Sequence, residues 1–129
     1  MEKAIYQAIY PIGQTDPMDM PVADVERAAR WYVEKMGFTV DARDQSSTSV
    51  TISRGQVKMR LAKNGRDPEQ ASCYIAVDNV DAAREELASA GVNISEIRPD
   101  EYGGVKRRVF FAKDDDGLCY CLGSKIAPE

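Results

Sequence analysis

One pattern occurs twice in this chain. Residues 21–32 and residues 76–87 each place apolar positions, a capping residue and a short amphipathic stretch in the same order. Three positions of the first copy recur 55 residues later in the second: Val22, Val25 and Ala28 return as Val77, Val80 and Ala83. Each copy predicts the end of a strand, then a helix, a glycine and a new strand. We therefore expect two similar units, with a functional site between them.

The composition is that of an ordinary globular domain. The 129 residues are 43% hydrophobic and 29% charged, with a formal net charge of −4, which is enough for one domain with its own core. The longest positive run is residues 106–108, and no apolar run has the length of a membrane span. The beginning of the chain lacks the apolar core of a signal peptide. We expect no nucleic-acid or membrane partner.

The cysteine and histidine content limits the disulfides, metal sites and catalytic bases that the chain can form. The three cysteines are an odd number, and we interpret them as reduced thiols of a cytoplasmic protein. The chain contains no histidine. This removes the commonest metal ligand and the commonest general base near neutral pH.

The first unit, residues 17–63, is predicted as strand, helix and three strands. Asp24 is a suitable helix cap, an apolar stripe follows at helical spacing, and Gly37 ends the helix. The strands are expected at residues 18–22, 38–43, 48–53 and 56–62. A polar linker with glycine and proline follows at residues 63–70.

The second unit, residues 71–126, repeats this order. Asp78 or Asn79 caps a helix that runs through Ala90. Strands are expected at residues 72–77, 92–97, 107–113 and 118–122, with a loop at 99–105 and a hairpin turn at 114–117. Residues 1–16 form an apolar N-terminal extension, which we expect to pack on the domain or on a partner subunit as an extra strand.

Three segments resemble the vicinal-oxygen-chelate superfamily of glyoxalases, extradiol dioxygenases and bleomycin-resistance proteins. They are residues 22–38, residues 77–83 and residues 108–117, of which the last is similar to an Arg-x-Phe motif near Asp-Pro-x-Gly-Asn. Asp115 replaces the proline and Leu118 the asparagine. The resemblance spans residues 17–126. It implies an α+β fold in which tandem βαβββ modules form a curled, cup-like mixed sheet with helices outside.

Metal-dependent members carry ligands on the first and last strands of each unit. By spacing, these positions fall on Pro17, Arg60, Ser72 and Cys121. Proline has no ligating side chain, arginine is a fixed cation, and one thiolate is not a metal site. We therefore predict no metal site and no cofactor.

Two arginines are candidate ligand-binding residues. Arg60 either faces the cup and binds an anionic group of the ligand, or is neutralised by a nearby carboxylate of the protein. Arg108, which matches the Arg-x-Phe motif, either points into the cup or pairs with the Asp114–Asp116 turn. Arg60 would hold a carboxylate, phenolate or phosphate of the ligand if no protein carboxylate reached it.

Four further residues complete the predicted ligand site. Ser72 and Tyr74 share one strand face, as do Cys119 and Cys121, of which we assign Cys121 to the wall of the cup. The two cysteines suit either a soft metal or redox pair, or simple packing. Tyr102 lies in the predicted loop, where it either stacks on a flat ligand or is solvated.

The resemblance makes a metal-free small-molecule-binding protein of the bleomycin-resistance type the preferred interpretation. It would sequester an organic or antibiotic-like ligand as a homodimer. One alternative is an enzyme of the superfamily, a lyase, isomerase or oxygenase, that is cofactorless or uses atypical metal ligands. Another is an interaction module whose cup is filled by side chains. Fold alone does not decide among them.

Overall fold

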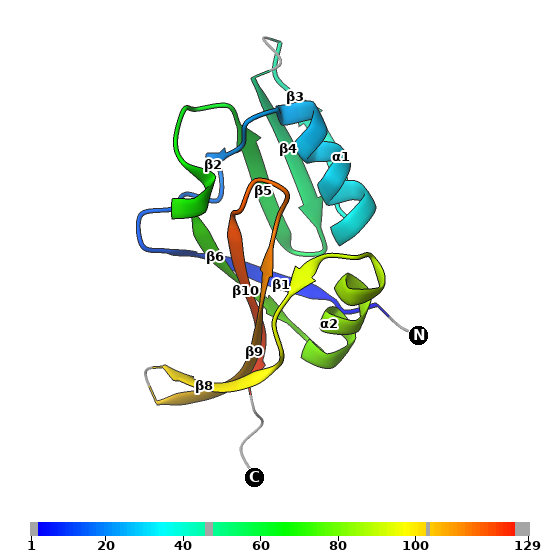
Figure 1. The fold of residues 1–129 in the computed structure, drawn as a ribbon, viewed down its shortest axis with the longest axis vertical. Helices are drawn as coiled ribbons and strands as arrows, with labels where there is room; N and C mark the ends of the chain where they lie inside the picture. The colour runs from blue at the N-terminus through cyan, green and yellow to red at the C-terminus, as the bar shows by residue number, and fades with distance from the viewer. Residues whose placement is uncertain (1–2, 46–47, 103, 126–129) are drawn as a thin grey trace.

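Within residues 3–45, 48–102 and 104–125, which the computed structural model describes, the fold consists of two sheets and two α-helices (Figure 1). The elements in chain order are β1 (Tyr6–Ile12), β2 (Met20–Pro21), α1 (Val25–Met36), β3 (Thr39–Arg43), β4 (Ser49–Arg54), β5 (Val57–Ala62), the short 3₁₀-helix η1 (Pro68–Gln70), β6 (Ser72–Val77), α2 (Val80–Ser89), β7 (Asn93–Ile94), β8 (Arg98–Tyr102), β9 (Val105–Lys113) and β10 (Cys119–Lys125). The expected α+β class is confirmed: both sheets mix parallel and antiparallel pairs and neither closes.

The first unit forms a four-stranded sheet in the order β2-β5-β4-β3, with α1 packed on it. Asp24 caps α1, since its side-chain oxygen accepts the backbone N–H of Arg27 at 3.1 Å. The buried stripe of the helix follows helical spacing: Val25, Ala28, Ala29, Tyr32 and Met36. Gly37 ends α1 with φ at 71°, a left-handed conformation that favours glycine.

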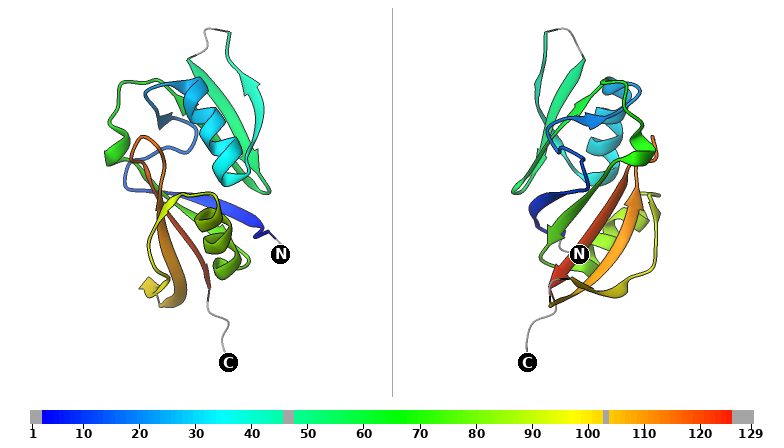
Figure 2. Two further views of the ribbon diagram at one scale, coloured as in Figure 1. Left: turned by 45° about the vertical axis from the view of Figure 1, so that its right-hand side comes forward. Right: turned by 90° about the vertical axis from the view of Figure 1, so that its left-hand side faces the viewer.

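The second unit forms a six-stranded sheet in the order β1-β6-β10-β9-β7, with β8 paired to β9. Asn79 caps α2 by accepting the N–H of Ala82 at 3.0 Å, and the helix buries Val80, Ala83 and Leu87. Both helices lie on the same side of the molecule, so the opposite faces of the two sheets carry no helix (Figure 2).

The N-terminal extension supplies β1, which pairs antiparallel with β6 of the same chain. A register shift between Tyr6 and Ala8 interrupts the alternation of this strand. Tyr6 is buried at 1% exposure, whereas Tyr10 is 56% exposed. The irregularity therefore sends Tyr6 into the core and places Tyr10 and Ile12 on the uncovered face of the sheet, while Ile9 packs against the core.

The prediction of a loop at residues 99–105 is wrong. Residues 98–102 form β8, which pairs antiparallel with β9 and places Asp100 opposite Arg107. The strand expected at 92–97 is correspondingly short, because only Asn93 and Ile94 pair with β9. The glycines of this region gave a turn signal, and Gly104 lies in a turn directly before β9, with φ at 79°.

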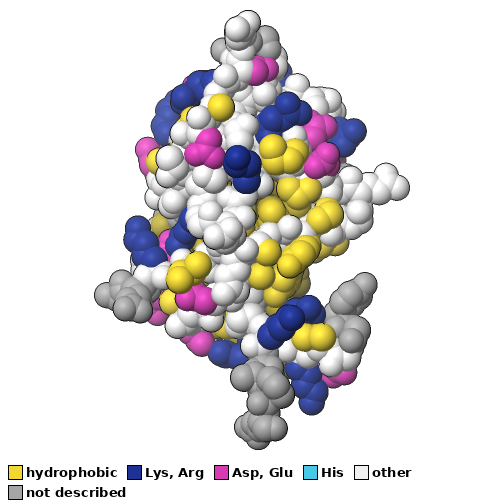
Figure 3. Space-filling model, turned by 180° about the vertical axis from the view of Figure 1, so that it is seen from behind, with side chains coloured by type: hydrophobic (Ala, Val, Ile, Leu, Met, Phe, Trp, Pro, Cys, Tyr) yellow, Lys and Arg dark blue, Asp and Glu magenta, His cyan; other side chains and the backbone are white. Residues whose placement is uncertain are grey.

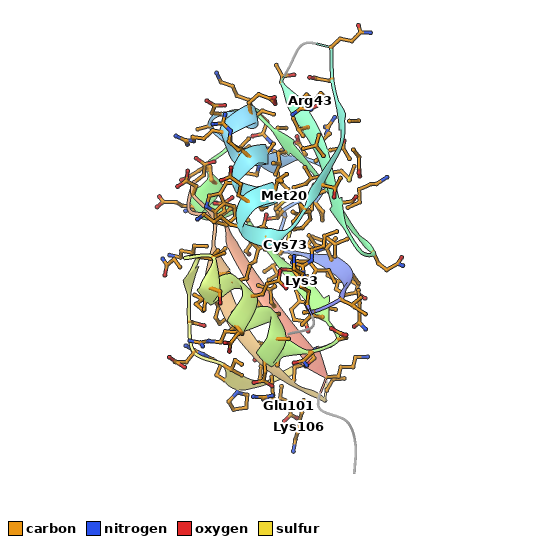
Figure 4. The ribbon with its side chains drawn as sticks, turned by 90° about the vertical axis from the view of Figure 1, so that its right-hand side faces the viewer. Lys3, Met20, Arg43, Cys73, Glu101 and Lys106 are labelled. Carbon is orange, nitrogen blue, oxygen red and sulfur yellow. The ribbon has the colours of Figure 1, made fainter. Side chains whose placement is uncertain are left out.

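Side chains from both units meet at the junction of the two sheets. Figure 4 places Met20 of β2 and Cys73 of β6 there, and the Cys73 thiol lies 3.9 Å from the Met20 sulfur. The hydroxyl of Tyr32 on α1 donates to a side-chain oxygen of Asp114 at 2.5 Å and lies 2.6 Å from the hydroxyl of Tyr120 on β10. A buried polar network thus joins the first unit to the second.

An ion pair makes a second connection. The guanidinium of Arg54 on β4 donates two hydrogen bonds to Glu86 of α2, at 2.6 and 2.8 Å. The same group donates to the carbonyl oxygen of Ala4 at 2.9 Å and lies 4.0 Å from the centre of the Tyr6 ring. Arg54 thereby ties both units and the N-terminal segment together.

Candidate functional site

Strand alternation gives the second sheet two different faces. On β6, Cys73 and Ile75 are fully buried among the core residues, whereas Ser72 and Tyr74 are half-buried on the other face. Cys119 and Cys121 of the parallel neighbour β10 stand beside Ser72 and Tyr74 in register. Side chains on this second face point away from α2, as expected for one wall of a cup.

A cavity of about 480 Å³ opens on this face of the sheet. Five strands contribute to it or border it, from β1 and β6 through β10 and β9 to β8. Its lining residues are Tyr10, Pro11, Ile12, Gly13, Tyr74, Asp100, Arg107 and Cys121. Seen from the side opposite the helices, hydrophobic side chains form a band across the middle of this face (Figure 3). The volume is suited to a small organic molecule.

Two tyrosines form the aromatic wall of the cavity. Tyr10 and Tyr74 are direct partners in the β1–β6 register, and their rings stack with centroids 6.3 Å apart and planes inclined by 27°. Gly123 of β10 leaves room for this wall, since a Cβ there would lie 3.1 Å from the Tyr74 hydroxyl. The exposed face of Tyr10 extends the stack, so the wall offers a flat surface on which a planar ring can lie.

Two opposite charges flank the aromatic wall. Arg107 and Asp100 are cross-strand partners on β9 and β8, and both line the cavity. The Arg107 guanidinium lies 5.6 Å from the centre of the Tyr74 ring. Burial raises the pKa of Tyr74, and the charge of Arg107 opposes that rise. The phenol therefore keeps its proton at neutral pH and can donate a hydrogen bond.

The thiol of Cys121 also stays protonated. Burial raises its pKa to about 11, the carboxylate of Asp100 adds to the rise, and Arg107 opposes it. Burial likewise raises the pKa of Cys119. All three cysteines are free thiols. A protonated thiol is a poor nucleophile, which favours the packing role over a redox role for this pair.

Ser72 lies in a neighbouring cavity of about 360 Å³, which shares Ile12 and Cys121 with the first. Phe111 and Cys119 also line it. The backbone N–H of Ser72 donates to the hydroxyl of Thr15 at 3.0 Å. Ser72 therefore borders the aromatic cavity but does not face it.

The model of the glyoxalase/bleomycin resistance protein/dioxygenase superfamily matches residues 14–121. This chain belongs to that superfamily. No curated protein matches the chain in sequence. Among the described residues, neither α-helix is long and apolar enough to cross a membrane.

Several solved structures share this fold. TnmS3, an antibiotic-binding protein from Streptomyces sp. CB03234, is 22% identical, with a TM-score of 0.72 over 89% of this chain and 98% of its own. The bleomycin-binding protein of Streptomyces verticillus, in complex with copper(II)-bleomycin, is 20% identical, with a TM-score of 0.68 over 91% and 98%. A superfamily protein from Alicyclobacillus acidocaldarius is 13% identical, with a TM-score of 0.72 over 89% and 93%.

The superfamily ligand positions are divided between the two sheets. No group of three or more His, Cys, Asp or Glu residues that could hold a metal ion is found in residues 3–45, 48–102 and 104–125. Of the four positions assigned by spacing, Cys121 and Ser72 lie on the second sheet and Arg60 on the first.

Arg60 occupies the uncovered face of the first sheet, between the buried Met59 and Leu61. Its Nε donates to the carbonyl oxygen of Met18 at 2.8 Å, and its Nη2 lies 3.8 Å from the Asp19 carboxylate. A protein carboxylate therefore does reach this arginine. Arg60 does not line the cavity that contains Tyr74 and Cys121.

The assignment of Arg108 to the cup is wrong, and so is its alternative pairing with the 114–116 turn. Arg108 is on the helix-covered face of β9, where it donates two hydrogen bonds to Asp81 of α2, at 2.7 and 3.1 Å. This hydrogen-bonded pair lowers the pKa of Asp81. Alternation along β9 puts Arg107 on the cavity side instead. Tyr102 ends β8, and its side chain lies outside the described part of the structure.

Sequence reasoning missed Arg107, Asp100 and Tyr10 as lining residues. Strand alternation groups 107, 109 and 111 on one face, and only the β9–β10 register, which pairs Phe111 with Cys121, shows that this face lines the cavity. Asp100 and Tyr10 gave no such signal, since the first stands in a strand predicted as a loop and the second follows the irregularity in β1.

A larger polar cavity of about 600 Å³ lies between the β1–β2 connection and the linker before β6. Its carboxylates are already engaged. Asp16 accepts the N–H of Met18 at 2.9 Å, Asp19 lies 3.8 Å from both Arg60 and Arg66, and Asp67 caps η1. We therefore take the aromatic cavity as the candidate site.

Proposed function

We propose that this protein binds a planar organic molecule in the aromatic cavity, without metal and without covalent chemistry. The observation that carries the proposal is the stacked pair Tyr10 and Tyr74 beside the charged side chains of Arg107 and Asp100. Aromatic walls hold a flat ring by stacking and burial, and a few polar groups fix its orientation.

The protonation of the cavity wall supports binding over catalysis. The pKa of Cys121 is about 11, and burial raises that of Tyr74. Neither group is a base or a nucleophile near pH 7. Antibiotic-binding and bleomycin-binding proteins occur among the structures with this fold, and a sequestering role of that type requires no reactive group.

A ligand screen tests this function. Purified protein in EDTA is screened by thermal shift against planar polycyclic natural products, quinones and indoles, and hits are titrated by calorimetry. Tyr74→Ala should weaken a hit by about 1–2 kcal/mol through lost stacking and burial. Arg108→Ala, on the helix-covered face, is the control and should not change the affinity.

Three outcomes would count against the proposal. They are the absence of any hit, equal affinity for wild type and Tyr74→Ala, and binding that appears only when a divalent metal is added. Conversion of a hit to a product would support the enzyme alternative instead.

We also propose that the protein is a cytoplasmic homodimer. Tyr10, Ile12 and Phe111 are 56%, 44% and 37% exposed on the uncovered face of the second sheet, and β1 is its edge strand. Apolar faces and strand edges of this kind are usually covered. Light scattering at micromolar concentration should give a dimer for wild type and a monomer for Ile12→Asp; a wild-type monomer would refute the assembly.

A further inference from the structure

The two charged side chains of the cavity have opposite signs and lie on adjacent strands. Arg107 and Asp100 stand directly opposite each other on β9 and β8 and both line the cavity. Among the described residues, neither side chain takes part in a salt bridge, although cross-strand partners are close enough to form one. Both charges are therefore available to a molecule in the cavity.

Several arginines of the chain pair with carboxylates, whereas Arg107, like Arg98 over Phe111, lies over an aromatic ring. Arg108 makes a two-bond pair with Asp81, Arg54 makes one with Glu86, and Arg60 has Asp19 at 3.8 Å. The guanidinium of Arg107 instead leans over the Tyr74 ring. Its position follows the aromatic wall rather than a protein carboxylate.

Adjacent opposite charges discriminate among ligands by charge pattern. A ligand with only a carboxylate is attracted by Arg107 but repelled by Asp100 at a similar distance, so the two effects largely cancel. A ligand with only an ammonium is attracted by Asp100 but repelled by Arg107, so its two interactions largely cancel as well. A ligand that carries both groups can place each against its opposite, and the aromatic wall supplies the surface for a ring.

Resting on the proposed function, we propose that the cavity selects a planar aromatic zwitterion, a ring joined to a carboxylate and an ammonium as in an aromatic α-amino acid or its derivative. The ring lies on Tyr10 and Tyr74. The ligand carboxylate binds Arg107, whose guanidinium offers two parallel N–H donors, and the ligand ammonium binds Asp100.

Four indoles separate the contributions of ring, anion and cation. They are tryptophan, indole-3-propionate, tryptamine and 3-methylindole, titrated by calorimetry at pH 7 and low salt. We expect tryptophan to bind about tenfold more tightly than either singly charged indole, the gain of one partly exposed charge-assisted hydrogen bond. 3-Methylindole should bind through the ring alone.

Charge-neutral variants should change the order of preference, not only the affinity. Asp100→Asn removes the repulsion of a lone carboxylate, so indole-3-propionate should rise to the affinity of tryptophan. Arg107→Gln should do the same for tryptamine. The matched controls are Glu101→Gln and Lys106→Gln, the next cross-strand pair near the end of the same hairpin (Figure 4). Strand alternation places this pair on the other face of the hairpin. These should leave the order unchanged, and thermal shift confirms that all four variants fold.

The outcomes distinguish this inference from the proposed function. Equal affinities for the four indoles, or an order that Asp100→Asn and Arg107→Gln leave unchanged, would overturn the zwitterion preference while the cavity remained a ring-binding site. Failure of all four indoles, with a screened uncharged compound bound in a Tyr74-dependent way, would overturn it as well. Failure of every compound would overturn both.

Discussion

Replacing Tyr32 by phenylalanine tests whether the buried polar network at the junction holds the two units together. The Tyr32 hydroxyl lies 2.5 Å from Asp114 and 2.6 Å from the hydroxyl of Tyr120. Tyr32 is 1% exposed, Tyr120 is fully buried and Asp114 is 9% exposed. The substitution deletes one oxygen and leaves the ring in place, with its edge-to-face contacts to Trp31 and Phe38.

The expected loss follows from the two hydrogen bonds. A bond to a charged group contributes about 1.5–3 kcal/mol net, and one between neutral groups about 0.5–1.5. Asp114 retains the N–H groups of Asp116 and Leu118, at 3.0 and 2.8 Å, so it is not left without partners. We therefore expect Tyr32→Phe to lower the free energy of unfolding by about 2–4 kcal/mol. At about 4 °C per kcal/mol for this size, Tm should fall by roughly 8–16 °C.

Urea unfolding followed by circular dichroism measures this difference, with calorimetry for Tm. Tyr10→Phe is the matched control, because the Tyr10 side chain is 56% exposed and the same oxygen is removed outside the core. Its free energy of unfolding should change by less than about 0.5 kcal/mol. Equal midpoints for the two variants would refute the idea that this network stabilises the junction.

Three further substitutions and one control variant test what stabilises the fold. Burial raises the pKa of Asp114 from its ordinary value of 3.8, so the folded state binds this proton more tightly than the unfolded state does. The stability that this group contributes should therefore fall as pH rises from 3.8 through the folded-state pKa. Asp114→Asn should flatten the dependence of the free energy of urea unfolding on pH in this range. A profile parallel to wild type would contradict this. The side chains of Arg54 and Glu86 are 10% and 18% exposed. Arg54→Met leaves the Glu86 carboxylate without its partner and should lower the free energy of unfolding by about 3–5 kcal/mol. The control Arg43→Met breaks a half-exposed pair and should lower it by at most about 1 kcal/mol. Gly123→Ala would put a methyl group 2.6 Å from a methyl group of Val109 on β9. It should lower the free energy of unfolding by about 1–3 kcal/mol. An unchanged urea-unfolding curve would contradict this, because β10 could then move to make room for the methyl group.

Part of the fold could be predicted from short-range signals. Asp24 and Asn79 cap the two helices as expected, and Gly37 ends the first. Helix capping, helical periodicity and helix termination at glycine involve residues only a few positions apart, so they can be recognised from the sequence alone. The repeated pattern likewise indicated two units of similar order.

The candidate site depended on long-range geometry. Tyr74 and Cys121 were predicted, because alternation along a strand is local. Arg107 replaced Arg108 because only the register of β9 against β10 decides which of two adjacent arginines faces α2. Tyr10 entered through a register shift in β1, and Asp100 through a hairpin. The sequence by itself therefore determined the elements and their alternation. The tertiary structure decided which faces meet, because a displacement of one residue turns every side chain of a strand to the other face.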